Sequence, residues 1–172
     1  LEFRRVLFRS GIALEPVANP EASWGDLNGD GYPDLLTTGI SRDSGQPLST
    51  IYMNVVGQFI PLASDDLPHV WGGAATWADI NGDGRDDVVL TGSTSPDYPY
   101  ATESAVLIND GNNGLIRVEA GIPPFMFGQA SFADIDGDGD QDMALTGDLG
   151  SGRLHAGIYE NTGVGSGGAF VV

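Results

Sequence analysis

The sequence predicts an all-β protein built from three copies of one four-stranded unit. An acidic motif of the form Asp-x-Asp/Asn-x-Asp-Gly-x-x-Asp begins at Asp26, Asp79 and Asp134, so that successive copies are 53 and 55 residues apart. Around each copy, short apolar or alternating runs are separated by glycine, asparagine, aspartate and proline, and no stretch has helical periodicity. Regularly spaced short strands with such turn residues between them are typical of an all-β repeat.

Four strands are expected in each unit. The first precedes the acidic motif, the second follows it and ends in Thr-Gly, the third comes after a variable polar stretch, and the fourth follows a glycine-containing turn. In chain order the expected strands are 22–24, 35–39, 50–55 and 58–62 in the first unit, 75–77, 88–92, 105–109 and 115–118 in the second, and 130–132, 143–147, 156–161 and 169–172 in the third. The polar stretches differ in length and chemistry, so we expect surface loops there. These stretches are 41–49, 93–103 and 148–154.

A repeat of about 50 residues with four strands is typical of a β-propeller blade. We therefore expect a partial β-propeller with antiparallel blades at 11–70, 71–126 and 127–172. Closed propellers have about four to eight blades, so we favour a fragment whose remaining propeller blades belong to a longer parent chain, with self-association into a ring as the alternative. The segment 1–10 holds three of the seven arginines and shares no pattern with the rest, so we interpret it as non-native and adapter-like.

One aromatic residue recurs on the first strand of every unit. Trp24, Trp77 and Phe132 each stand two residues before the acidic motif. Aromatic side chains at repeated positions usually become buried, so we expect these three to pack between blades and not to bind a ligand.

The acidic motif has the chemistry of a calcium-binding loop. Its crowded carboxylates would repel one another unless a cation lay among them, and alternate oxygens on a tight loop suit a hard cation such as Ca²⁺. Positions one, three, five and nine would supply side-chain oxygens, and position seven its backbone carbonyl. The predicted ligands are Asp26, Asn28, Asp30, Tyr32 and Asp34 in the first loop, Asp79, Asn81, Asp83, Arg85 and Asp87 in the second, and Asp134, Asp136, Asp138, Asp140 and Asp142 in the third. We expect about three bound Ca²⁺ ions.

Two further features of the motif support this interpretation. Glycines at positions four and six permit the positive φ angles that turn successive oxygens inward. The residue at position two is always apolar, and we expect its side chain to anchor the loop in the hydrophobic core. These residues are Leu27, Ile80 and Ile135. The loops are not EF-hands, because position twelve lacks the glutamate and the flanking segments are strands. Magnesium favours tighter sites with more retained water, so calcium is the better assignment.

The overall charge excludes several classes of partner. The chain has 24 acidic residues against seven arginines and no lysine, for a formal net charge of -17, and half of the acidic residues lie in the three motifs. Such a negative electrostatic field argues against binding to nucleic acid and against binding to an anionic membrane surface. There is no cysteine, hence no disulfide or zinc–thiolate site. There is also no apolar run long enough for a membrane-spanning helix, so no membrane insertion is expected.

The segments 24–39, 77–92 and 132–147 resemble FG-GAP/VCBS repeats, the blades of integrin α-subunit propellers and of many bacterial surface proteins. The Trp-Gly-Gly-Ala at Trp71 and the Phe-Gly-Gln-Ala at Phe127 are similar to the phenylalanine-glycine element of that family. The resemblance implies a propeller with calcium in the first hairpin of each blade. It also implies that ligands are recognised on the face opposite the calcium loops.

Outside the acidic motifs, one loop is a candidate for ligand contact. Asp97, Tyr98 and Tyr100 lie in a stretch with two prolines, a stiff aromatic surface suited to a sugar or a peptide, although an ordinary surface loop is the alternative. The glycine-rich segment 163–168 formally contains Gly-x-Gly-x-x-Gly, but no helix follows to receive a phosphate, so a hairpin is expected. There is no serine-centred nucleophile elbow and no lysine or cysteine nucleophile.

These observations together predict a calcium-stabilised extracellular or cell-surface binding and adhesion module without catalytic activity, whose ligand is a protein or a glycan. The alternative is a propeller fragment of a secreted polysaccharide-degrading lyase or hydrolase. The extracellular location follows from the resemblance and from calcium availability, since the sequence shows no export signal.

Overall fold

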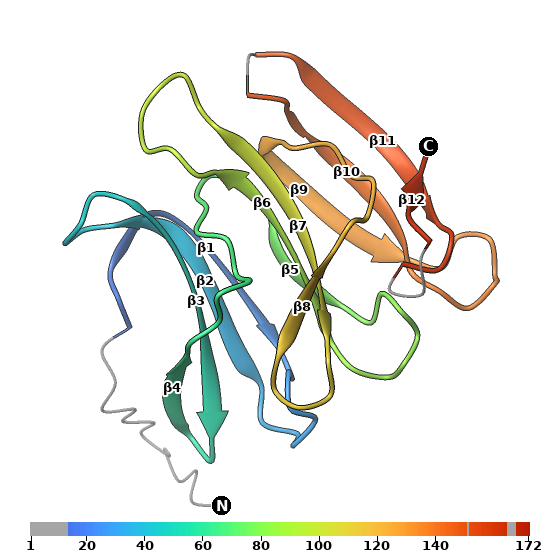
Figure 1. The fold of residues 1–172 in the computed structure, drawn as a ribbon, viewed down its shortest axis with the longest axis horizontal. Helices are drawn as coiled ribbons and strands as arrows, with labels where there is room; N and C mark the ends of the chain where they lie inside the picture. The colour runs from blue at the N-terminus through green and yellow to red at the C-terminus, as the bar shows by residue number, and fades with distance from the viewer. Residues whose placement is uncertain (1–13, 151, 165–167) are drawn as a thin grey trace, which may run out of the picture.

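A computed structural model describes residues 14–150, 152–164 and 168–172 of the chain, and these residues form twelve β-strands and no helix (Figure 1). The expected all-β fold with three four-stranded antiparallel sheets is therefore confirmed. The described residues include no helix long and apolar enough to cross a membrane. The segment 1–10 and the middle of the glycine-rich segment 163–168 lie outside the described residues.

Each sheet is a simple meander in which consecutive strands pair antiparallel. The first sheet consists of β1 (Val17–Gly25), β2 (Asp34–Ser41), β3 (Pro47–Val55) and β4 (Gln58–Leu62), the second of β5 (Ala75–Ala78), β6 (Asp87–Ser93), β7 (Thr102–Asn109) and β8 (Leu115–Val118), and the third of β9 (Met126–Ala133), β10 (Asp142–Asp148), β11 (Leu154–Asn161) and β12 (Phe170–Val171). The strands β1 and β9 begin earlier than the sequence predicted, and we call the three sheets blades 1, 2 and 3.

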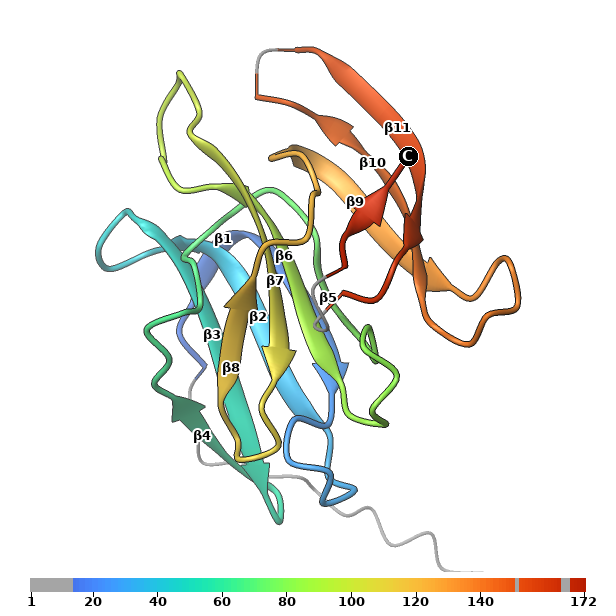
Figure 2. The same cartoon turned by 45° about the vertical axis from the view of Figure 1, so that its right-hand side comes forward.

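The blades stand side by side with blade 2 in the middle (Figures 1 and 2). Their first strands are neighbours, since β5 contacts both β1 and β9. This is the arrangement of successive propeller blades, in which the first strand of each blade lies innermost. The three acidic loops connect the first and second strand of each blade and lie at the same end of the molecule (Figure 2).

One hydrophobic cluster fills each interface between blades. The cluster between blades 1 and 2 includes Leu36, Ile51, Val88 and Leu107, with Trp77 packed against it. The cluster between blades 2 and 3 includes Val89, Val106, Met143 and Tyr159, with Phe132 packed against it. Adjacent residues of β6 point to opposite faces of the sheet, so blade 2 contributes to both cores. The expected packing of Trp77 and Phe132 between blades is confirmed, whereas Trp24 is 58% exposed on the free side of blade 1.

At the end opposite the acidic loops, two glycines allow backbones to cross closely. A Cβ on Gly73 would lie 2.0 Å from the carbonyl oxygen of Thr91, and a Cβ on Gly128 would lie 1.8 Å from that of Thr146. The backbone N–H of Phe127 also donates to the carbonyl of Gly72, which links blades 2 and 3. The phenylalanine-glycine element and its Trp-Gly-Gly counterpart therefore hold the start of each inner strand against the next strand of its own blade.

Candidate metal centres

The acidic loops wrap the backbone around the first aspartate of the motif. The N–H of the glycine at position six donates to that carboxylate, at 2.8 Å from Gly31 to Asp26 and at 2.8 Å from Gly84 to Asp79. The glycines at positions four and six have φ angles between 68° and 102° in all three loops, as the motif predicted. Because only glycine adopts such angles without strain, the sequence dictates this local turn.

The third loop concentrates negative charge most strongly. Carboxylate oxygens of Asp134, Asp136 and Asp138 lie within 4.8 Å of one another. Asp140 adds a buried Oδ1 atom that has no hydrogen-bond partner. Burial, followed by the charges of Asp138 and other nearby carboxylates, raises the pKa of Asp140 to about 6. A cluster of hard oxygen donors with an unpaired buried oxygen fits a hard cation such as Ca²⁺ and offers no nitrogen or sulfur donor to a softer metal.

The first two loops carry fewer carboxylates and satisfy some of them internally. The asparagine at position three donates to the aspartate at position five, at 3.0 Å from Asn28 to Asp30 and at 3.0 Å from Asn81 to Asp83. In the second loop the guanidinium of Arg85 also lies 2.5 Å from Asp83. The carboxylate of Asp83 is therefore already paired with a side-chain cation, which distinguishes the second loop from the third.

The aspartate at position nine anchors each loop to the core. Asp34 is fully buried, and its two oxygens accept the backbone N–H groups of Leu27 at 2.9 Å and of Asn54 at 2.6 Å. Asp87 and Asp142 accept the equivalent pairs of bonds. Burial raises the pKa of Asp34, and it raises that of Asp87 to about 6. The sequence predicted a metal ligand here; the geometry adds a second role, because each oxygen retains a lone pair for an ion.

The apolar residue at position two behaves differently in the third loop. Leu27 and Ile80 are fully buried, as predicted. The prediction is wrong for Ile135, which is 60% exposed. The reason is positional: Leu27 and Ile80 are covered by the following blade, and no blade in the described part of the chain follows blade 3.

Sequence reasoning missed a set of asparagines that join neighbouring blades. The side-chain amide of Asn109 donates to the carbonyl of Leu27 at 2.7 Å, and that of Asn161 donates to the carbonyl of Ile80 at 2.8 Å. Each bond runs from the end of the third strand of one blade to position two of the acidic loop in the preceding blade. The recurrence of asparagine after the third expected strand, also at Asn54, was the signal that could have revealed them.

The tyrosines of the predicted ligand loop belong to a larger aromatic cluster. Tyr100 contacts Tyr98, Trp71 and Phe127 edge to face, with ring centroids 5.7, 5.5 and 5.9 Å away. Tyr98 is 75% exposed, and Asp97 is exposed beside it. The sequence did not predict that this loop meets the aromatic residues of the Trp-Gly and Phe-Gly elements.

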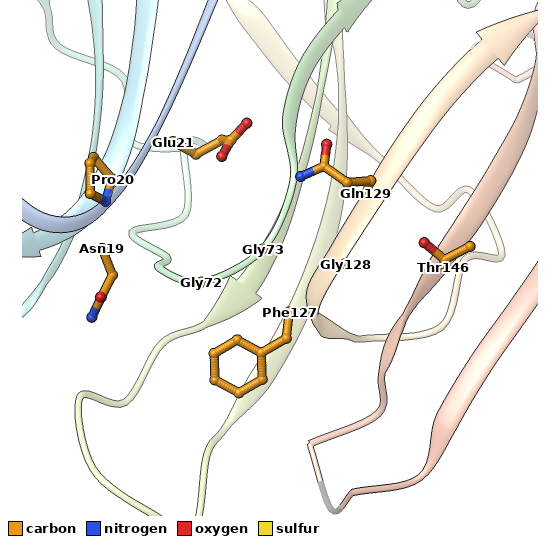
Figure 3. A pocket seen from close by; sticks show the side chains of 9 residues that line it. All are labelled: Asn19, Pro20, Glu21, Gly72, Gly73, Phe127, Gly128, Gln129 and Thr146. Atoms are coloured by element: carbon orange, nitrogen blue, oxygen red, sulfur yellow. The ribbon is translucent and has the colours of Figure 1, made fainter.

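A cavity of about 330 Å³ adjoins this cluster between the inner strands of the three blades (Figure 3). Phe127 forms part of its wall, together with the polar side chains of Asn19, Glu21, Gln129 and Thr146. The cavity and the aromatic cluster lie at the end of the blades opposite the acidic loops. An aromatic surface beside hydrogen-bonding groups is suited to a polar organic ligand.

Comparison with known families agrees with the repeat structure. Residues 26–90 match the family model of the FG-GAP-like repeat. This span runs from the first acidic loop through the second and ends in the middle of β6. The resemblance to FG-GAP repeats that the sequence suggested is therefore confirmed for residues 26–90. No curated protein matches the chain.

Proposed function

We propose that this chain is a calcium-stabilised β-propeller module that binds a protein or carbohydrate ligand outside the cell and performs no catalysis. The observation that carries the proposal is the third acidic loop, where three carboxylates converge and a fourth leaves a buried oxygen unpaired. A divalent cation would neutralise this charge and satisfy that oxygen. The family match over residues 26–90 supports a propeller-type module.

Calcium would act structurally in this proposal. Each ion would lie on oxygens of positions one, three, five, seven and nine, and would hold the first hairpin of its blade. Because the carboxylates repel one another without metal, ion binding and folding are coupled, and calcium raises the free energy of unfolding. Sites of this kind in extracellular modules often bind at millimolar calcium, which supports an extracellular or cell-surface location.

Ligand contact is assigned to the end of the module opposite the acidic loops. Tyr98 offers an exposed ring beside the half-buried Tyr100, and Asp97 offers an exposed carboxylate next to it. Further blades, supplied by a longer parent chain, would extend this surface, since closed propellers have about four to eight blades. Binding and not turnover is proposed because, among the described residues, the Thr146 hydroxyl in the wall of this cavity makes no hydrogen bond to a carboxylate or an imidazole that could act as a general base.

Isothermal titration of the chelator-treated chain with Ca²⁺ tests the metal sites. We expect heat of binding for up to three ions and a higher melting temperature in calcium than in chelator. Absence of both effects would overturn the calcium proposal.

An array of glycans and matrix proteins, probed in calcium, tests ligand binding separately. We expect binding that Tyr98→Ala and Tyr100→Ala weaken, while Ile116→Ala, an exposed residue on β8 outside the aromatic cluster and the acidic loops, leaves it unchanged. Turnover of a polysaccharide by the chain would contradict the non-catalytic assignment.

A further inference from the structure

Three asparagines of the chain are followed directly by glycine, as Asn28-Gly29, Asn81-Gly82 and Asn113-Gly114. Asparagine is a thermally labile residue, because the backbone nitrogen of the next residue can attack its side-chain amide carbon. Glycine hinders this attack least, since it has no Cβ and its backbone adopts many conformations. The first two pairs occupy positions three and four of the acidic loops, and the third lies in the turn between β7 and β8.

The attacking nitrogen is unpaired in the two acidic loops. Among the described residues, the N–H groups of Gly29 and Gly82 form no hydrogen bond, and both glycines are exposed. The surrounding space is open as well, because a Cβ built on either glycine would meet no atom within 4 Å. Each loop can therefore change its local conformation without displacing a packed neighbour.

The side-chain carbonyl that would be attacked is polarised at both sites. The Oδ1 atom of Asn28 accepts the backbone N–H of Asp30 at 3.1 Å, and that of Asn81 accepts the N–H of Asp83 at 3.1 Å. A donor on this oxygen stabilises the negative charge that develops there when a nucleophile attacks Cγ. Asn28 is exposed and Asn81 is half-buried, so water reaches both side chains.

The third pair provides a contrast within the same chain. The backbone N–H of Gly114 donates to the carboxylate of Asp110 at 2.9 Å. A Cβ built on Gly114 would lie 2.5 Å from that carboxylate, so the glycine is closely covered. Before its nitrogen can attack Asn113, this hydrogen bond to a charged group must break, and the proton must leave beside a negative charge. The fold therefore protects Asn113, although the residue that follows it is also glycine.

We propose that Asn28 and Asn81 are sites of spontaneous deamidation in the folded chain. The backbone nitrogen of Gly29 gives up its proton to solvent base and forms a bond to Cγ of Asn28, and the Cγ–Nδ2 bond breaks as ammonia leaves. Water then opens the resulting cyclic imide, a succinimide, at either of its carbonyls. The products are aspartate and isoaspartate. The net reaction consumes water and releases ammonia without oxidation or reduction, and Asn81 reacts with the nitrogen of Gly82 in the same way.

The two products change an acidic loop differently. Aspartate gives the first two loops the carboxylates at positions one, three, five and nine that the third loop already has. It also removes the amide that donates from Asn28 to Asp30 at 3.0 Å. Isoaspartate moves a carbon atom from the side chain into the backbone, which shifts the carboxylate away from the other loop oxygens. The consequence for metal binding rests on the proposed calcium sites, whereas the deamidation itself does not.

Incubation of the full chain in neutral buffer with chelator, below its melting temperature, tests the proposal by peptide mapping with mass spectrometry. We expect Asn28 and Asn81 to convert at least about tenfold faster than Asn113, because only Asn113 requires a hydrogen bond to a carboxylate to break first. In denaturant the three rates converge, since the protection of Asn113 comes from the fold. Each event adds a negative charge, so conversion of both loops takes the formal net charge from -17 to -19, which isoelectric focusing detects.

Glutamine variants identify the reacting residues. Glutamine keeps the amide but must form a larger ring, so it reacts far more slowly. We expect a chain with both Asn28→Gln and Asn81→Gln to lose the rapid change in charge, and the matched control Asn113→Gln to keep it. Equal rates at the three sites in the folded chain, or no conversion of Asn28 and Asn81 while the denatured chain reacts, overturns the proposal.

A parallel incubation in calcium separates this proposal from the metal sites. In the proposed function the Oδ1 atoms of Asn28 and Asn81 bind the ion, which fixes both side chains. Calcium then slows their conversion and leaves that of Asn113 unchanged. If calcium left all three rates unchanged while Asn28 and Asn81 still converted fastest in chelator, the ligand assignment would fail and the deamidation sites would stand.

Discussion

The side-chain amide of Asn109 donates to the backbone carbonyl of Leu27 at 2.7 Å, across 82 residues of sequence and the interface between two blades. Leu27 is fully buried, so water cannot replace this donor. The same carbonyl belongs to an acidic loop whose ninth residue, Asp34, accepts the N–H of Leu27. One residue of the candidate metal loop is thus fixed both to its own blade and to the next.

Removing the Asn109 amide tests how much this joint stabilises the chain. We expect Asn109→Ala to lower the free energy of unfolding by about 1–3 kcal/mol more than Asn54→Ala, because only the first leaves a buried carbonyl unpaired. Asn54 is the matched control, since it makes the equivalent bond within its blade but none across a described joint. Urea unfolding of both variants at concentrations where the chain is monomeric gives the difference. Equal losses would show that the bond across the joint contributes nothing measurable.

Gly128 allows the start of β9 to cross β10 without a side chain between them. We expect Gly128→Ala to destabilise the chain by about 3 kcal/mol, because the new Cβ would meet the backbone oxygen of Thr146 and backbone cannot move aside cheaply. Gly157→Ala is the control, since its Cβ would meet only the side chains of His155 and Tyr159. Thermal unfolding compares the two. A Gly128→Ala variant as stable as Gly157→Ala would contradict the assigned role.

Asp138 lies at position five of the third loop, within the cluster of carboxylates. We expect Asp138→Asn to weaken calcium binding at this loop by about tenfold or more, because it removes a charged ligand. In chelator, the same variant is at least as stable as the unsubstituted chain, since it relieves repulsion among the remaining carboxylates. This opposite effect in the two conditions distinguishes a metal ligand from a purely structural aspartate.

Melting temperatures in calcium and in chelator provide the measurement for Asp138→Asn. Asp65→Asn is the control, because Asp65 is an exposed aspartate outside the acidic loops. Equal destabilisation by Asp138→Asn in both conditions would assign Asp138 to the fold alone.

Most of the fold was predictable because the sequence repeats its local signals. The spacing of the acidic motifs defined three units, and the glycine at position six, such as Gly31, dictated the turn. The start of β1 was missed because its residues, around Pro20, carry no strand pattern. There the backbone pairs with β2 through an irregular register between Ala18 and Glu21.

The contacts between blades could not be predicted from local pattern. Trp24 and Trp77 are identical residues at equivalent positions, and only the presence of a preceding blade determines which of them is covered. Likewise, the proximity of Tyr100 to Phe127 depends on how blade 3 lies against blade 2. Such contacts depend on tertiary placement, about which strand periodicity carries no information.

The acidic loops predict opposite pH dependences with and without calcium. Burial raises the pKa of Asp87 to about 6, and burial with neighbouring carboxylates raises that of Asp140 to about 6. An unfolded aspartate has a pKa of about 3.9, so the folded metal-free chain binds these protons more tightly, and its stability falls as the pH rises from about 4 to 6. Calcium requires the ionised carboxylates, so its affinity rises over the same interval. We therefore expect the increase in melting temperature caused by calcium to be small near pH 5 and large above about pH 7.

Two variants test whether Asp140 contributes to this pH dependence of stability. Asp140→Asn, which cannot titrate, should reduce the dependence, whereas Asp65→Asn should leave it unchanged. A metal-free chain that becomes more stable from pH 5 to pH 7, or a calcium effect that is equal at both, would contradict the assignment of these carboxylates to the metal sites.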